Sequence, residues 1–141
     1  GFPTGNPKTI EGLLERICGK IEANKDDIIK YNSYDVDDAE VILLAYGSPA
    51  RSARQVQQQA RVRGEKVGLF QLLTAWPFPH EVLQKLYAET KAPFVIPELS
   101  LGQLAEEVSK SVPREKIDSV LRNDGEMITP AQLDKAVRGV L

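Results

Sequence analysis

Residues 41–51 read V-I-L-L-A-Y-G-S-P-A-R, and this stretch decides the fold. A continuous apolar run that ends at a turn is typical of a strand buried on both faces. Ser48 is placed to cap the next helix with its hydroxyl, and Pro49 suits the first helical position, which needs no amide hydrogen. The stretch therefore predicts a central strand over 41–46. Gly47 and Ser48 follow it, at the end of the strand where open α/β sheets usually bind ligands or partners.

Similar strand signals alternate with helix signals along the rest of the chain. We expect an edge strand over 31–35 and further strands over 66–74, 93–97 and 116–121. We expect helices over 49–63 and 79–90, a helix after the S-x-x-Q capping box at Ser100–Gln103, and a last helix from Thr129-Pro130 onward. Alternation of this kind implies right-handed crossovers and a mainly parallel sheet covered on both faces. The fold class is therefore α/β. The face of helix 49–63 that carries Gln57 and Arg61 is expected to be solvated.

The amino-terminal segment carries a separate helical signal. Asn6-Pro7 is a cap followed by proline, and apolar residues recur at helical spacing after it. We therefore expect a helix over 7–23 that runs on towards residue 29. Cys18 lies in its apolar stripe and is expected to be a small core residue. Either the domain's own sheet or a neighbouring chain must cover this stripe.

Composition and charge limit the class of protein. The chain has 141 residues, which suit one domain with a real core, and we divide it into a linker and helix over 1–30 and an α/β domain over 31–141. A net charge of −2 gives no reason to invoke nucleic acid, and no apolar run approaches the roughly 20 residues that span a membrane. One cysteine and one histidine exclude an internal disulfide or iron–sulfur cluster and argue against a metal site. The absence of a secretion signal at the start and the single cysteine fit a cytoplasmic protein.

The sequence contains no recognisable catalytic motif. There is no glycine-rich dinucleotide motif, no Walker motif and no G-x-S-x-G elbow, and no nucleophile signature accompanies His80. We therefore assign no catalytic residue. Gly47 and Ser48, with Arg51 one helical turn later, are a candidate anion or domain-boundary site, because an exposed helix N-terminus and a guanidinium could hold a carboxylate or phosphate. The simpler interpretation is a capped helix with a surface arginine.

The second candidate is an aromatic corner, Trp76, Pro77, Phe78 and Pro79, which follows a predicted strand. Two aromatic side chains held by two prolines would make a hydrophobic anchor, and tryptophan is enriched at interface hot spots. These four residues are a candidate interface. The alternative is a loop that folds into the core of the domain itself.

The third candidate is Glu98, which follows an apolar strand and precedes the predicted capping box of Ser100 and Gln103. A carboxylate in this place is desolvated unless it has a partner, so it either serves a ligand or pairs with a cation. We assign Glu98, Ser100 and Gln103 to the same candidate anion or domain-boundary site as the first group.

Together these landmarks resemble a known family. A-Y-G-S-x-A-R at 45–51, L-T-x-W-P-F-P at 73–79 and P-E-x-x-x-G-Q-L at 97–104 are similar to elements of the alpha subunit of 2-oxoacid:ferredoxin oxidoreductases. The opening G-F-P-T-G-N-P and the D-G-x-x-I-T-P-x-x-L run at 124–133 also fit the carboxyl-terminal part of that subunit. The resemblance covers nearly the whole chain.

The resemblance implies a three-layer α/β/α domain with a five-stranded, mainly parallel mixed sheet, similar to the transketolase carboxyl-terminal domain and known in this family as core domain II. The family converts a 2-oxoacid and coenzyme A to an acyl-CoA, carbon dioxide and reduced ferredoxin, with thiamine diphosphate and iron–sulfur clusters. The resemblance further implies that this domain makes subunit contacts in an oligomer. Its expected partners are the thiamine-binding domain and the beta subunit, with ferredoxin reached through the complex. It implies that this chain binds none of the cofactors and is inactive alone.

Two departures from the family pattern accompany the resemblance. Gln71-Leu72 stand where we expect Arg-Pro, which removes a cation from that strand end, and Ser100 stands where asparagine is common. Neither departure identifies the 2-oxoacid. Two alternative functions stay open: a self-contained anion or small-molecule-binding α/β domain that uses the helix starts at Ser48 and Ser100, and a purely structural interaction module without a redox context.

Overall fold

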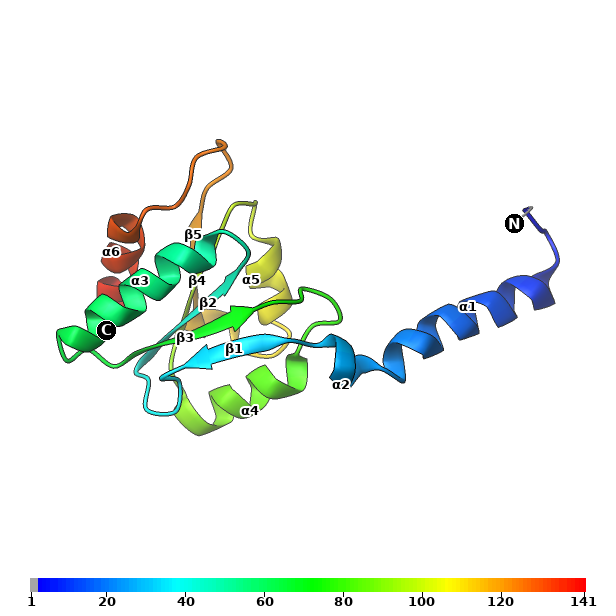
Figure 1. Ribbon diagram of the computed structural model, residues 1–141, viewed down its shortest axis with the longest axis horizontal. Helices are drawn as coiled ribbons and strands as arrows, with labels where there is room; N and C mark the ends of the chain where they lie inside the picture. Colours follow the sequence, from blue (N-terminus) through cyan, green and yellow to red (C-terminus); the bar gives the residue numbers. More distant parts are fainter. Residues whose placement is uncertain (1–2) are drawn as a thin grey trace.

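The computed structural model describes residues 3–141, in which a five-stranded sheet forms the centre (Figure 1). The strands are β1 (Tyr31–Tyr34), β2 (Val41–Tyr46), β3 (Val67–Leu72), β4 (Phe94–Glu98) and β5 (Ile117–Leu121), in the spatial order β1-β3-β2-β4-β5. β1 runs antiparallel to β3, and the other neighbours are parallel. The predicted mainly parallel mixed sheet is confirmed, and its antiparallel member is the short edge strand.

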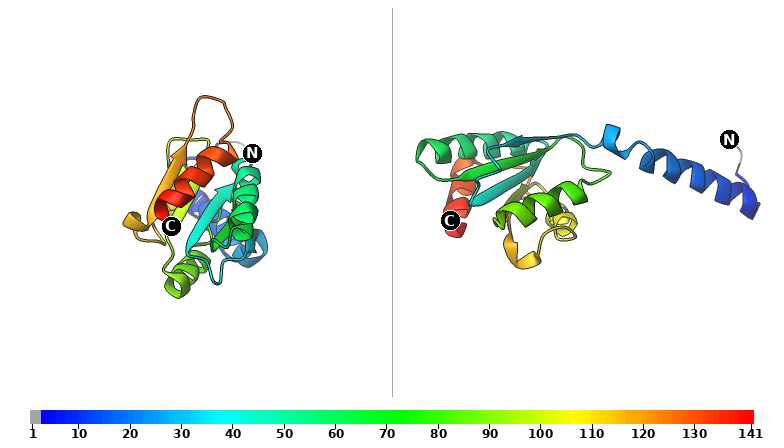
Figure 2. Two further views of the ribbon diagram at one scale, coloured as in Figure 1. Left: turned by 90° about the vertical axis from the view of Figure 1, so that its left-hand side faces the viewer. Right: turned by 90° about the horizontal axis from the view of Figure 1, so that it is seen from below.

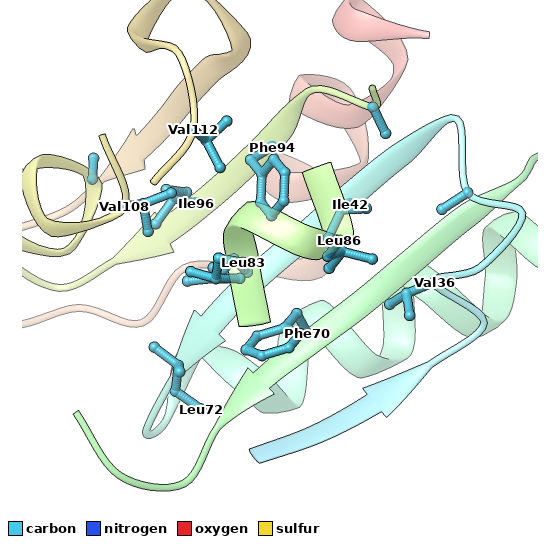
Figure 3. Packing of buried hydrophobic residues seen from close by; sticks show 14 of the residues in the cluster. Val36, Ile42, Phe70, Leu72, Leu83, Leu86, Phe94, Ile96, Val108 and Val112 are labelled. Carbon is cyan, nitrogen blue, oxygen red and sulfur yellow. The ribbon is translucent and has the colours of Figure 1, made fainter. Parts of the chain in front are cut away.

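Helices cover both faces of the sheet, as the alternating pattern predicted. α3 (Pro49–Val62) and α6 (Pro130–Val140) pack on one face, and α4 (His80–Thr90) and α5 (Gln103–Val108) pack on the other, with a short 3-10 helix, η1 (Arg114–Lys116), before β5. Figure 3 shows the second face, where Leu83 and Leu86 of α4 meet the apolar side chains of the strands. α6 is capped by Thr129, whose side chain forms a capping box with Gln132.

β2 lies in the middle of the sheet and explains the apolar run that opened the sequence. Val41, Leu43 and Ala45 face α3 and α6, whereas Ile42 and Leu44 face α4 and α5, and all five are fully buried. A strand with a helix layer on each face needs apolar side chains in both directions, so its residues do not alternate with polar ones.

The predicted solvated face of α3 is wrong for Gln57 and Arg61. Gln57 is 1% exposed, and its Nε2 donates a hydrogen bond to Asp35 Oδ2 at 2.6 Å. Arg61 donates to the carbonyl oxygen of Val67 at 2.8 Å and pairs with Asp38 at 2.7 Å. The cause is tertiary, because the connection between β1 and β2 lies against this side of α3.

α1 (Pro7–Glu22) stands apart from the domain (Figures 1 and 2). It begins as predicted, since Asn6 accepts hydrogen bonds from the next amides, but it ends at Glu22 and does not continue towards residue 29. A separate turn of helix, α2 (Lys25–Ile28), follows. None of the sixteen residues of α1 is buried, so the expectation that Cys18 is a core residue is wrong. The helix does not pack on the sheet.

Candidate functional site

The carboxyl ends of β2, β3 and β4 lie at one edge of the sheet, which we call the carboxyl edge, because these three strands are parallel neighbours. A groove of about 460 Å³ lies there between the turns that follow the strands. It brings together five of the six residues that the sequence assigned to an anion or domain-boundary site: Gly47, Ser48, Glu98, Ser100 and Gln103. Arg51 does not line the groove and lies exposed on the first turn of α3.

The prediction that Ser48 caps α3 with its hydroxyl is wrong. Its backbone is already helical, with φ −63° and ψ −36°, and its side chain makes no capping hydrogen bond. An N-cap hydroxyl reaches the next amides from an extended backbone, which Ser48 does not have. The turn is made by Gly47 instead, whose φ of +67° favours glycine. Pro49 occupies the first turn as predicted.

The predicted capping box of Ser100 and Gln103 is also wrong, because Glu98 takes its place. The Glu98 carboxylate is 4% exposed and accepts hydrogen bonds from the Ser100 hydroxyl at 2.5 Å and from the amides of Leu104 and Ala105 at 2.9 and 3.2 Å. Gln103 instead accepts from the amide of Leu101.

Glu98 thereby fills the amino-terminal end of α5 with negative charge, which the helix dipole favours. Sequence reasoning expected a cation or a ligand as its partner. The structure provides backbone amides and a hydroxyl, so the buried carboxylate holds the start of α5 against the end of β4.

The electrostatics of the groove do not suit an anion. The charged side chains that line it are Glu98 and Glu107, and no lysine or arginine is among the lining residues. Glu107 forms ion pairs with Lys110 at 2.5 Å and with His80 at 3.0 Å. The hydrogen bond and charge of Lys110 lower the pKa of Glu107, and His80 makes a smaller contribution in the same direction. An entering phosphate or carboxylate would therefore meet two carboxylates. The same donor set does not fit the diphosphate of thiamine diphosphate, so we assign no cofactor contact to this groove.

The aromatic corner is divided between the core and the surface. Phe78 is 4% exposed and belongs to the core on the α4 and α5 side, and Pro77 and Pro79 are buried beside it. Trp76 is 70% exposed. The part of the predicted anchor that a partner can reach is therefore Trp76, while Phe78 anchors the loop to its own domain.

Sequence reasoning missed further apolar side chains at this edge. Tyr46, Leu73, Leu99 and Leu101 are 40–73% exposed and follow, or end, β2, β3 and β4. With Trp76 they form what we call the apolar edge. The sequence did contain a signal for these exposed side chains, because each apolar run continues to the last residue of its strand or beyond it. Of the departures from the family pattern, Gln71 stands where the arginine is expected and is partly exposed in β3, and Leu72 stands where the proline is expected and is buried in the core.

The fold defines the class: a three-layer α/β/α domain with a mainly parallel five-stranded sheet, which two solved structures share. A 2-oxoglutarate:ferredoxin oxidoreductase from Magnetococcus marinus shares this fold with a TM-score of 0.83, at 22% identity over 99% of this chain and 24% of that chain. A split-gene transketolase matches with a TM-score of 0.65, at 20% identity over 79% of this chain and 41% of that chain.

The family follows from the sequence comparison. Residues 39–133 match the pyruvate:ferredoxin oxidoreductase core domain II, and the chain belongs to this family. It is 38% identical over 140 residues to the 2-oxoglutarate synthase subunit KorA of Methanocaldococcus jannaschii, covering 99% of this chain and 37% of the relative. It is 33% identical over 121 residues to the ketoisovalerate oxidoreductase subunit VorB of Methanothermobacter marburgensis, covering 86% and 34%. The chain thus spans a little over a third of the length of these relatives.

Within residues 3–141, no three His, Cys, Asp or Glu side chains come together as ligands for a metal ion. A single cysteine cannot supply the cysteine set of an iron–sulfur cluster. Among the helices described, none is long and apolar enough to cross a bilayer.

Proposed function

We propose that the chain is an assembly domain of the alpha subunit of a 2-oxoacid:ferredoxin oxidoreductase. The complete enzyme would convert a 2-oxoacid and coenzyme A to an acyl-CoA and carbon dioxide while it reduces ferredoxin. In this proposal the thiamine diphosphate and the iron–sulfur clusters are held by other domains or subunits. The domain described here contributes contacts and does not contain the catalytic centre.

The observation that carries this proposal is the apolar edge. Parallel strands usually end in ligand-binding loops, yet here they end in large exposed apolar side chains: Tyr46, Leu73, Trp76, Leu99 and Leu101. Large exposed apolar side chains gathered at one end of a sheet are typical of an interaction site, and an exposed tryptophan is a common anchor in such a site. We propose the thiamine-binding domain and the beta subunit as the partners, in an oligomeric complex.

The substrate class in this proposal is a 2-oxoacid. The curated relatives are named for 2-oxoglutarate, ketoisovalerate and pyruvate. The lining of the carboxyl-edge groove has no lysine or arginine that could hold the carboxylate of these acids, so in this proposal the choice among them belongs to the catalytic domain. We also propose a cytoplasmic location, which the use of a single cysteine supports.

Reconstitution with the thiamine-binding domain and beta subunit tests the proposal. Trp76→Ala is expected to weaken assembly about tenfold or more, because hot-spot residues carry most of the binding energy. The melting temperature of the isolated chain should stay within a degree or two, since Trp76 is 70% exposed.

Phe78→Ala is the matched control, because its ring is buried in the core. It should lower the melting temperature strongly. Titration calorimetry of the isolated chain with thiamine diphosphate should show no binding. Micromolar affinity for that cofactor, or assembly that is indifferent to Trp76, would refute the proposed role.

A further inference from the structure

The loop that joins β3 to α4 carries Trp76 and is held by hydrogen bonds at its two ends (Figure 1). At the β3 end, the amides of Leu73 and Thr74 both donate to the carbonyl oxygen of Lys30, at 3.0 and 3.1 Å. Residues 75–77 make no hydrogen bond to any other residue that the structure describes. The orientation of the Trp76 side chain therefore depends on how the two ends of the loop are fixed.

His80 fixes the α4 end of this loop. It is the first residue of α4, and its Nε2 lies 3.0 Å from Glu107 Oε1 while its Nδ1 lies 2.8 Å from Ser111 Oγ. Nε2–H can donate to the carboxylate, and the hydroxyl can either donate to Nδ1 or accept from it. Both ring nitrogens therefore have a partner whether the imidazole is neutral or charged. Because Glu107 lies in α5 and Ser111 follows that helix, the ring ties the start of α4 to the end of α5.

These contacts take the place of a cap at the start of α4. In α1 and α6 the side chains of Asn6 and Thr129 cap the helix. The residue before α4 is Pro79, which makes no capping hydrogen bond with its side chain. The first side chain of α4 thus fixes the start of this helix through tertiary contacts.

The chain between Trp76 and His80 is stiff. Pro77 and Pro79 have restricted φ angles, and each proline restricts the residue before it to extended backbone. Few rotations therefore separate the Trp76 side chain from the His80 ring. The two residues also line the same cleft of about 330 Å³, together with Glu107. A change in how His80 is held should consequently alter the orientation of Trp76.

We propose that His80 is a positioning residue for Trp76. By tying α4 to α5, it holds the loop in one conformation before a partner binds. A loop that is ordered beforehand loses less conformational freedom on binding, which raises the affinity. The inference rests on the proposed function, in which Trp76 contacts the thiamine-binding domain or the beta subunit.

The fluorescence of Trp76 provides the test, because it is the only tryptophan of the chain. Its anisotropy in the full chain reports side-chain motion on the nanosecond timescale. His80→Leu removes both ring contacts, and we expect it to lower the anisotropy well below the melting temperature and to weaken assembly about threefold or more. His80→Gln keeps an NH2 group that can donate to Glu107 and should restore most of both values. Gln84→Leu, at an exposed position of α4, is the matched control and should change neither.

A purely stabilising role predicts a different result. His80→Leu would then lower the melting temperature but leave the anisotropy of the folded chain unchanged, and this result overturns the inference. Failure of His80→Gln to restore the anisotropy overturns it as well. If His80→Leu does not fold, the pair Glu107→Ala and Ser111→Ala removes both partners of the ring, and an unchanged anisotropy in that variant overturns the inference.

The outcomes also separate this inference from the function on which it rests. If the unaltered chain assembles with the thiamine-binding domain and beta subunit but His80→Leu changes neither anisotropy nor assembly, only the inference fails. A lower anisotropy without weaker assembly likewise overturns the inference alone. An unaltered chain that does not assemble overturns the proposed function and the inference together.

Discussion

β2 and the apolar stripe of α1 both carry large aliphatic side chains but have opposite environments. The side chains of residues 41–45 are fully buried, whereas none of the residues of α1 is buried. β2 lies between two helix layers of its own domain. α1 leaves that domain, and its apolar side chains Ile10, Leu14 and Ile17 stay 39–55% exposed. The comparison teaches that a periodic apolar pattern predicts that a segment will be covered, but not which domain or chain covers it.

The same contrast recurs over two residues in the loop after β3. Trp76 and Phe78 are both aromatic and both adjoin a proline, yet the first is 70% exposed and the second 4% exposed. Residue type could not separate them. Phe78 belongs to the core on the α4 and α5 side, while Trp76 stays exposed and lines a cleft with residues of α1.

The largest expected effect compares a leucine from each region. Leu43→Ala in β2 should lower the free energy of unfolding by about 2–5 kcal/mol, because it leaves a cavity in a fully packed core. Leu14→Ala in α1 should change it by no more than about 0.5 kcal/mol, since that side chain is 55% exposed. Urea unfolding of the isolated chain measures both values. A loss of similar size for Leu14→Ala would mean that α1 packs on the domain in solution.

The next effect concerns the carboxyl edge, where a buried charge has a structural role. Glu98→Gln replaces a carboxylate that accepts three hydrogen bonds by an amide whose NH2 group faces the same donors. The free energy of unfolding should fall by about 1–3 kcal/mol, the usual cost of leaving buried donors without acceptors. Glu115→Gln, at an exposed position, is the control and should be nearly neutral. If the two variants were equally stable, the structural role would be wrong and Glu98 would again be a candidate ligand-binding residue.

Most of the fold could be predicted from hydrophobic periodicity, and competing tertiary contacts explain the features that could not. The strands and helices of 31–141 follow from apolar spacing and from prolines at helix starts. The predictions of helix caps at Ser48 and Ser100 were wrong, because a local sequence pattern shows which residues are able to cap a helix and not which residue does so in the folded chain. Glu98 reaches the amides of α5 from the preceding strand and displaces the nearer candidate. Gln57 is buried by the connection between β1 and β2, which no local pattern in α3 encodes.

The position of the candidate site could be predicted from the sequence, but its apolar character could not. Five of its six residues gather in one groove because parallel strands end at the same edge, and that follows from topology alone. Its apolar character depends on how the turns orient Leu99 and Leu101, which their identity as leucine does not reveal. Sequence alone therefore could not choose between an anion site and a protein interface.

The smallest expected effect is electrostatic and compares Lys110, which pairs with the groove residue Glu107, with Lys20 on α1. The hydrogen bond from Lys110, its charge and that of His80 lower the pKa of Glu107 in the folded chain. A carboxyl group with a lowered folded pKa contributes stability above its unfolded pKa, and this stability is lost as the pH falls through the folded pKa. The free energy of unfolding should therefore decline as the pH falls from about 5 towards 3, across and below the ordinary range of glutamate.

Lys110→Met should make that decline shallower without abolishing it, because His80 still contacts Glu107 at 3.0 Å. Lys20→Met on α1, which removes no ion pair between described residues, should leave the decline unchanged. Unfolding by urea at several pH values measures the three slopes. A slope that responds equally to both lysines would show that the two regions share one electrostatic environment, which would break the contrast between them.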